Sequence, residues 1–341
     1  MSIVLPMMDK NLADDEVFRV FCAHKAALAV LDYYGIADGI FYLNNSLEFR
    51  YESDEHQPDC YATVIDYMPI FAALRGQTHF IYGDDHRHIW NGNKQQILAG
   101  HPVIMGVDQF FLPYHAECGV SHGAHAVVLY GFDDERERAF LLDKGCFNGT
   151  IDYNQLHHAR VSENSWNFNI NTGAALRYAS LTLAAAGWPE ATNDLIHGHL
   201  QESLDYFEAS DTDTGYTALE RMLRQFLKEM AGAEPPRDYY RYAHAQLFPQ
   251  AQKKRLFQYF LQRIRDRKGI KPLIELLETT NRVWDELLLT ILKLAYTSRN
   301  RSVLIGDVTT MTGQILKNEA QVFTALRYAA SRRQPVGRCG Q

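Results

Sequence analysis

The chain has 341 residues, of which 46% are hydrophobic, and a formal net charge of −7. This length and apolar content suffice for two domains with packed cores. No stretch approaches the roughly 18 apolar residues of a membrane span, and the first residues lack the basic and apolar regions of a signal peptide, so we expect a cytoplasmic protein. The cysteines include no CxxC pair, which predicts free thiols rather than a disulfide framework: Cys22, Cys60, Cys118, Cys146 and Cys339.

Charge is divided unevenly along the chain. Residues 1–185 carry a net charge of −11, whereas residues 186–341 carry +4. The acidic part argues against nucleic acid as the main partner. The mildly basic part is compatible with an acidic protein partner.

The first expected element is a helix over residues 22–34, which is apolar on nearly all faces and is followed by Gly35 at the position of a helix-ending glycine. A helix of this kind is usually buried at the centre of its domain. A second helix is expected over 62–74, kinked or broken by Pro69, and a third over 91–99.

Three short apolar runs come next, and each predicts a buried strand: 102–108, 124–134 and 138–145. The segment 133–136 between the last two runs is typical of a hairpin turn. One central helix followed by hairpin-linked strands predicts an α+β domain.

From about residue 179 the strand signals stop, and apolar residues recur at the three-to-four spacing of helices. The sequence therefore predicts a first domain over 1–178 and an all-helical domain over 179–341, with a frayed polar tail at 331–341. The clearest helical segments are 218–232, 253–268, 272–298 and 303–330.

Cys22 opens the expected central helix. Unpaired amides at a helix N-terminus favour the thiolate and can also receive an oxyanion. His125 starts a buried strand, and Asp143 ends the strand that follows it. If these strands form a hairpin, the aspartate comes within reach of the histidine. Each residue alone has an ordinary structural interpretation, but a cysteine, a histidine and an aspartate in this order predict a nucleophile, its base and the residue that orients the base.

Three segments carry a resemblance to a known family: CAHKAALAVLDYYGI, HPVIMGVDQFFLPYH and HGAHAVVLYGFDDERERAFLLDKG. They resemble the butirosin biosynthesis protein H N-terminal family, over roughly residues 15–160. The resemblance implies a papain-like core, in which a central helix packs on an antiparallel sheet, followed by a helical domain. It also implies that Cys22, His125 and Asp143 occupy the catalytic positions.

The family's namesake moves an aminoacyl group from a carrier-protein thioester to an amine. By resemblance, this chain is expected to be a cysteine-dependent acyltransferase of specialised metabolism, with an acyl or peptidyl carrier protein and an amine-bearing small molecule as partners. The phosphopantetheine arm would belong to the carrier protein, so no tightly bound cofactor is expected.

Two departures from papain-like peptidases bear on the reaction. Residues 14–21 contain no glutamine to supply an oxyanion-hole amide, and Cys22 is followed by Ala23 rather than glycine. A thioester is more activated than an amide and needs less oxyanion stabilisation, so both departures favour thioester chemistry. A cysteine peptidase, amidase or thioesterase with the same three residues remains an alternative. A non-catalytic scaffold that binds carrier proteins is another.

The segment before His125 allows further interpretations. His115, Cys118, His122 and His125 are dense enough to suggest zinc, although their spacing matches no familiar finger. Tyr114 and His115 could line the acyl pocket as substrate-binding residues, or they could be ordinary loop residues.

The segment 253–268 is strongly basic. It could be a solvated helix face, or it could bind the acidic recognition helix of a carrier protein. Exposed apolar stripes on the helical half would also suit a homodimer.

Overall fold

The computed structural model describes most of the chain, with gaps in the first third and in the loops between helices. The described residues are 1–7, 22–36, 39–43, 47, 49, 52–53, 61–62, 78–81, 83–162, 178, 180–188, 192–209, 215–231, 237–297 and 299–331. The chain divides into two units. The first unit comprises Met1–Asn44 and Tyr67–Glu190, and the second unit comprises Asn45–Asp66 and Ala191–Gln341.

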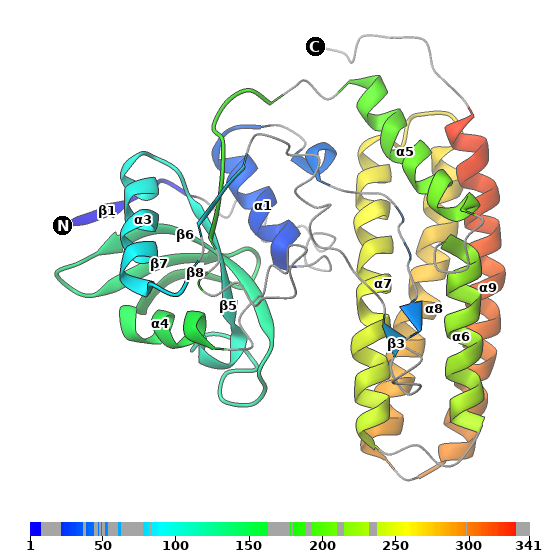
Figure 1. Cartoon of the computed structure of the whole chain (residues 1–341). Helices are drawn as coiled ribbons and strands as arrows, with labels where there is room; N and C mark the ends of the chain where they lie inside the picture. Colours follow the sequence, from blue (N-terminus) through cyan, green and yellow to red (C-terminus); the bar gives the residue numbers. More distant parts are fainter. Residues whose placement is uncertain are drawn as a thin grey trace. The chain divides into compact units, whose positions relative to one another are not determined.

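The first unit is built on a seven-stranded sheet whose pairs are antiparallel (Figure 1). The strand order is β4-β9-β5-β6-β7-β8, and β1 pairs with the end of β6. The strands expected at 102–108, 124–134 and 138–145 are present as β5, β6 and β7. The bounds are β1 (Ser2–Val4), β4 (Thr78–Ile81), β5 (Val103–Asp108), β6 (Ala124–Asp133), β7 (Arg138–Asp143), β8 (Phe147–Asp152) and β9 (Ser180–Leu183).

The helix α1 (Cys22–Tyr33) packs mainly against β6 and also contacts β5 and β7. Its residues from Ala23 to Leu31 are all buried, as its apolar sequence predicted. Gly35, with φ of 71°, adopts the left-handed conformation that ends the helix. A central helix on an antiparallel sheet confirms the predicted α+β class with a papain-like core.

Among its described residues, the first unit also contains two further helices and two 3₁₀ turns: α3 (His86–Leu98), α4 (Tyr153–Val161), η2 (Gly39–Tyr42) and η3 (Gln109–Phe111). The helix expected at 91–99 begins earlier, because the Asp85 side chain accepts a hydrogen bond from the His88 N–H and caps the first turn. The helix expected over 62–74 lies outside the described residues, apart from its first residue, which belongs to a strand.

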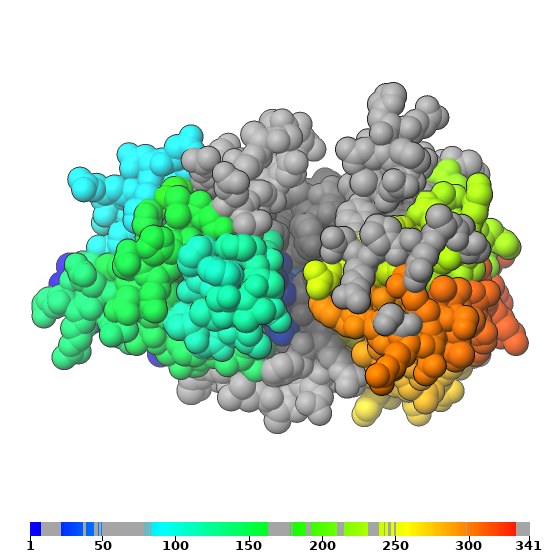
Figure 2. Space-filling model, turned by 90° about the horizontal axis from the view of Figure 1, so that it is seen from below, coloured from blue at the N-terminus to red at the C-terminus, as the bar shows by residue number. Residues whose placement is uncertain are grey.

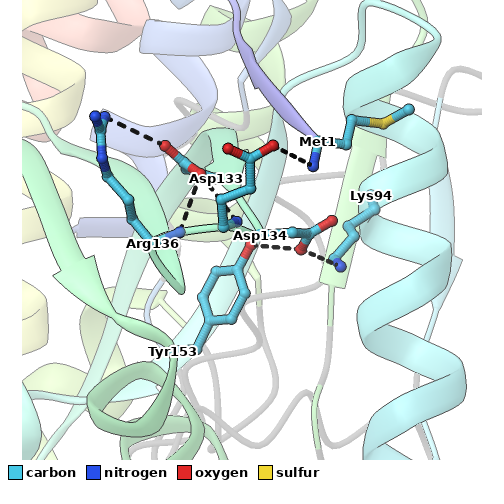
Figure 3. Close-up of polar contacts among 7 residues, drawn as sticks. Met1, Lys94, Asp133, Asp134, Arg136 and Tyr153 are labelled. Carbon is cyan, nitrogen blue, oxygen red and sulfur yellow. Dashed lines mark hydrogen bonds and ion pairs between the residues drawn. The ribbon is translucent and has the colours of Figure 1, made fainter.

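A polar cluster fixes the hairpin that joins β6 and β7 (Figure 3). The Asp134 carboxylate accepts hydrogen bonds from Lys94 Nζ at 2.5 Å and from the Tyr153 hydroxyl at 2.9 Å, so the turn is held by α3 and α4. The Asp133 carboxylate accepts from the backbone N–H groups of Glu135 and Arg136 within the turn. These contacts fix the turn between β6 and β7.

Part of the sheet was not expected from the sequence. The strand β8 and the helix α4 were not predicted, and neither was β9, which lies between β4 and β5. The expected domain boundary after residue 178 falls just before β9. The prediction that strands stop near 179 was therefore wrong, because Ser180–Leu183 complete the sheet of the first unit.

The second unit consists mainly of five helices among its described residues, with a two-stranded sheet of β2 (Glu52–Ser53) and β3 (Tyr61–Ala62). The long helices of this unit pack around a hydrophobic core that contains Trp284. The helix α8 packs along both α7 and α9. None of the described helices combines the length and the apolar character that a membrane span requires. The helices are α5 (Asn193–Glu208), α6 (Gly215–Ala231), α7 (Arg237–Arg263), α8 (Ile270–Tyr296) and α9 (Arg301–Ala330).

The basic segment 253–268 is only partly exposed. Lys253 and Lys254 are both only about one-twentieth exposed. Lys254 Nζ lies 3.0 Å from the carboxylate of Glu319, which is completely buried and also accepts a hydrogen bond from Trp284 Nε1. Two of the basic side chains in this segment are therefore buried, whereas Arg263, Arg265 and Lys268 are exposed. The interpretation of this segment as a binding surface for a carrier protein stays a prediction.

We expect Lys254→Met to destabilise the second unit by about 3–5 kcal/mol, because it leaves the Glu319 carboxylate buried without its counter-charge. Urea unfolding of the full chain, followed by tryptophan fluorescence, measures this loss. The matched control is Lys317→Met on α9, since Lys317 is exposed. Equal midpoints for the two variants would contradict the expectation.

Candidate active site

Cys22 is the first residue of α1 and is half-buried. Burial is the largest influence on its thiol and raises the pKa. The charge of His125, a hydrogen bond with that side chain and a backbone hydrogen bond from Ala126 together outweigh burial, so the pKa of Cys22 is lowered. The Cys22 thiol at the start of α1 therefore ionises more readily than an ordinary thiol.

His125 and Asp143 are hydrogen-bonded to each other, as the hairpin prediction required. His125 Nε2 lies 2.7 Å from Asp143 Oδ2. The histidine side chain is 13% exposed and the aspartate side chain 2%. Because Asp143 engages Nε2, the ring nitrogen left for the Cys22 thiol is Nδ1.

The imidazole is strongly basic in this setting. Burial lowers its pKa, but the negative charge of the Cys22 thiolate and the hydrogen bonds with Asp143 and Cys22 raise the pKa of His125 to about 10. The opposite shifts of the thiol and the imidazole favour a thiolate–imidazolium pair. Such a pair can attack an acyl carbon with the thiolate and protonate a leaving group with the imidazolium.

The register of the hairpin explains why these two residues meet. Val128 pairs with Leu142, so Asp143 falls opposite the residue that lies two positions after His125 on β6. Residues two apart on a strand point to the same face, and diagonal neighbours across a strand pair are within reach of each other.

The residue that follows Asp143 forms an ion pair that was not expected from the sequence. The neighbouring Lys144, which is 7% exposed, places its Nζ 2.5 Å from Asp32 Oδ2 near the end of α1. This ion pair joins the end of β7 to the helix that carries Cys22. Both partners were visible in the sequence, but only the packing of α1 on β7 brings them together.

Tyr114 lies next to Asp143. Its ring stacks on Phe147 with a centroid separation of 3.9 Å and an interplanar angle of 1°. Burial and the Asp143 charge raise the pKa of the phenol, so it stays protonated. Among the described residues its hydroxyl has no hydrogen-bond partner of ordinary geometry, although it is buried.

His115 lies next to His125, with 5.1 Å between the ring centroids. Its Nδ1 accepts a hydrogen bond from the Glu117 N–H at 3.2 Å, which places the proton on Nε2. Burial, followed by the positive charge of His125, lowers the pKa of His115 and keeps it neutral. The structure thus brings both expected pocket residues to the Cys22–His125–Asp143 cluster.

The alternative zinc arrangement finds no support in the geometry. His122 Nδ1 bonds to Asp108, His125 bonds to Asp143, and Cys118 is exposed. Within the described ranges, no three His, Cys, Asp or Glu side chains gather as metal ligands would.

A helix that presents a cysteine to a histidine on an antiparallel sheet is the arrangement of papain-like folds. Residues 22–144 match the family model described as Butirosin biosynthesis protein H, N-terminal. The match confirms the resemblance seen in the sequence motifs, and it runs from Cys22 to just beyond Asp143. Over these residues the chain is similar to that family. No curated protein matches the chain.

Proposed function

We propose that this protein is an acyltransferase of specialised metabolism that moves an acyl or aminoacyl group from a carrier-protein thioester to an amine. The observation that carries the proposal is the hydrogen-bonded series Cys22–His125–Asp143 at the N-terminus of a buried helix. The family match gives independent support, because the family takes its name from a biosynthesis protein.

In the first half-reaction the Cys22 thiolate attacks the thioester carbonyl carbon and forms a new C–S bond. The tetrahedral intermediate then expels the phosphopantetheine sulfur, which leaves as a thiol after taking the proton of the His125 imidazolium. The oxyanion is received by backbone N–H groups at the start of α1, including that of Cys22. The products are an acyl-enzyme and a neutral imidazole.

In the second half-reaction the amine nitrogen attacks the acyl-enzyme, and His125 takes its proton. Collapse of this intermediate forms the amide and releases the Cys22 thiolate, which restores the ion pair. Asp143 acts as a positioning residue, because its bond to Nε2 keeps Nδ1 toward the thiol through both steps. The carrier protein supplies the phosphopantetheine, and the cytoplasm is the proposed compartment.

Incubation with an acyl-carrier thioester, with and without an amine, tests the reaction class. The proposal requires amide product that depends on the amine. Cleavage of peptides without any reaction of the thioester would identify a peptidase instead. Hydrolysis of the thioester at a rate that amines do not change would identify a thioesterase.

Two substitutions of Asp143, which orients His125, are expected to lower the rate of transfer to different extents. Asp143→Ala leaves His125 Nε2 without its partner and frees the ring to rotate, so kcat/KM for transfer is expected to fall on the order of 10²-fold. Asp143→Asn keeps an acceptor oxygen at the same place but removes the charge, so its loss is expected to be smaller. Wild-type kcat/KM in the alanine variant would contradict the role of Asp143.

A further inference from the structure

The loop of residues 109–123 joins β5 to β6 and carries Tyr114 and His115. Its two ends are tied together by Asp108, the last residue of β5. Asp108 Oδ1 accepts hydrogen bonds from the Phe110 N–H at 3.0 Å and from the Gly123 N–H at 3.1 Å. The loop therefore closes on one carboxylate oxygen.

The other oxygen of Asp108 fastens the loop to the neighbouring helix. Oδ2 accepts from the Ser162 hydroxyl at 2.5 Å, directly after α4, and lies 2.7 Å from His122 Nδ1. Asp108 is completely buried. Burial raises the pKa of this carboxyl, but the bonds from Ser162, His122 and the backbone lower it below its usual range, so the carboxylate stays ionised.

Stacked aromatic rings and a close contact between the two ends of the loop restrict its conformation. His122 stacks on Phe110 with 4.1 Å between centroids, and Phe111 stacks on His158 of α4. A Cβ at Gly123 would lie 2.6 Å from the Gln109 side chain, so the loop ends meet closely. The loop reaches the surface of the first unit, where Figure 2 shows it in blue-green beside the green residues of α4.

We propose that Asp108 is a positioning residue that holds the 109–123 loop so that Tyr114 and His115 form one wall of the acyl pocket. The hydrogen bonds of Asp108 described above involve none of Cys22, His125 and Asp143. Those three residues are held by α1, by the β6–β7 hairpin and by the Lys144–Asp32 ion pair. Asp108 therefore acts on the binding of the acyl donor and not on the reactivity of the thiol.

The test is Asp108→Asn in the full chain. The amide keeps one acceptor oxygen but loses the charge and places an N–H₂ group where Ser162 and His122 now donate. The matched control is Asp133→Asn, because Asp133 also accepts two backbone N–H bonds, within the turn at the other end of β6. Ser162→Ala is a milder second variant that removes one bond and keeps the Asp108 carboxylate.

Three measurements decide the proposal. Hydrogen–deuterium exchange of the 109–123 amides is expected to accelerate in Asp108→Asn, and less strongly in Ser162→Ala, but not in Asp133→Asn. The kcat/KM for the carrier thioester is expected to fall about 10- to 100-fold, mainly through KM. Alkylation of Cys22 by iodoacetamide is expected to keep its wild-type rate and pH profile.

Unchanged exchange in the loop would overturn the proposal, as would a loss of Cys22 alkylation as large as the loss of kcat/KM. The kinetic readout rests on the proposed acyl transfer. If the wild-type protein transfers no acyl group, the proposed function fails, whereas exchange and alkylation still decide whether Asp108 holds the loop independently of the thiol.

Discussion

Replacing Cys22 by alanine is expected to abolish acyl transfer, so that amide forms no faster than in the absence of protein. The thiolate supplies the only atom that becomes acylated in the proposed reaction, and alanine has no group that could replace it. Turnover of an acyl-carrier thioester in the presence of an amine measures the loss. This is the largest effect that we expect from any single substitution.

The control for this experiment is Cys339→Ala, which removes a thiol from the polar C-terminal stretch of the sequence and is expected to retain activity. The thermal midpoint of the Cys22→Ala variant shows whether the fold is preserved. Full turnover by a folded Cys22→Ala protein would exclude covalent catalysis and favour the alternative of a non-catalytic scaffold.

His125→Ala is expected to lower the transfer rate by about 10²–10⁴-fold, because both proton transfers pass through this imidazole. It should also raise the pKa of the Cys22 thiol. In the intact protein, burial raises that pKa, and the interactions with His125 and the backbone hydrogen bond from Ala126 together outweigh burial. Without His125 its charge and its hydrogen bond no longer oppose the effect of burial, so less thiolate is present near neutral pH.

The pH dependence of alkylation tests this reasoning directly. In the wild-type protein the thiolate forms at a pH below the ordinary range of a thiol, and the imidazolium persists until the pH approaches about 10. Iodoacetamide should therefore modify wild-type Cys22 at pH values where the variant is unreactive. His88→Ala, at an exposed position on α3, is the control. Identical pH profiles for wild type and His125→Ala would contradict the ion pair.

The elements that the sequence predicted well are those with strong local signals. The helix α1 is apolar and ends at Gly35, and β5, β6 and β7 are apolar runs bounded by turn residues. The strand β8 contains Asn148 and Gly149 and alternates in exposure at its start, so its hydrophobic signal is weak. The strand β9 has only four residues and acquires its place from pairing with β4 and β5.

Burial of Lys253 and Lys254 in α7 could not be predicted locally. Lys254 is compensated by Glu319, which lies on α9 and far away in the sequence. A helical pattern shows which residues share a face, but it does not reveal which distant helix covers that face. The sequence therefore did not distinguish the buried Lys253 and Lys254 from the exposed Arg263, Arg265 and Lys268 of the same segment.

At the site, the order of residues along the chain was informative. The position of Cys22 at a helix start and of His125 at a strand start indicated their roles. The expected hairpin placed Asp143 near the histidine. The β6–β7 pairing contains a register irregularity between Leu129 and Gly131, which no local pattern indicated. Asp108 was missed, although it ends β5 just as Asp143 ends β7, and this shared position is a signal that could have drawn attention to it.

The most direct test of the central claim is the intact mass of the protein after brief exposure to an acyl-carrier thioester without an amine. We expect the wild-type mass to increase by one acyl group, peptide mapping to locate this group on Cys22, and added amine to remove it. The Cys22→Ala protein should gain no mass. A wild-type protein that consumes the thioester without acquiring the adduct, or an adduct that persists in Cys22→Ala, would exclude an acyl-enzyme on Cys22.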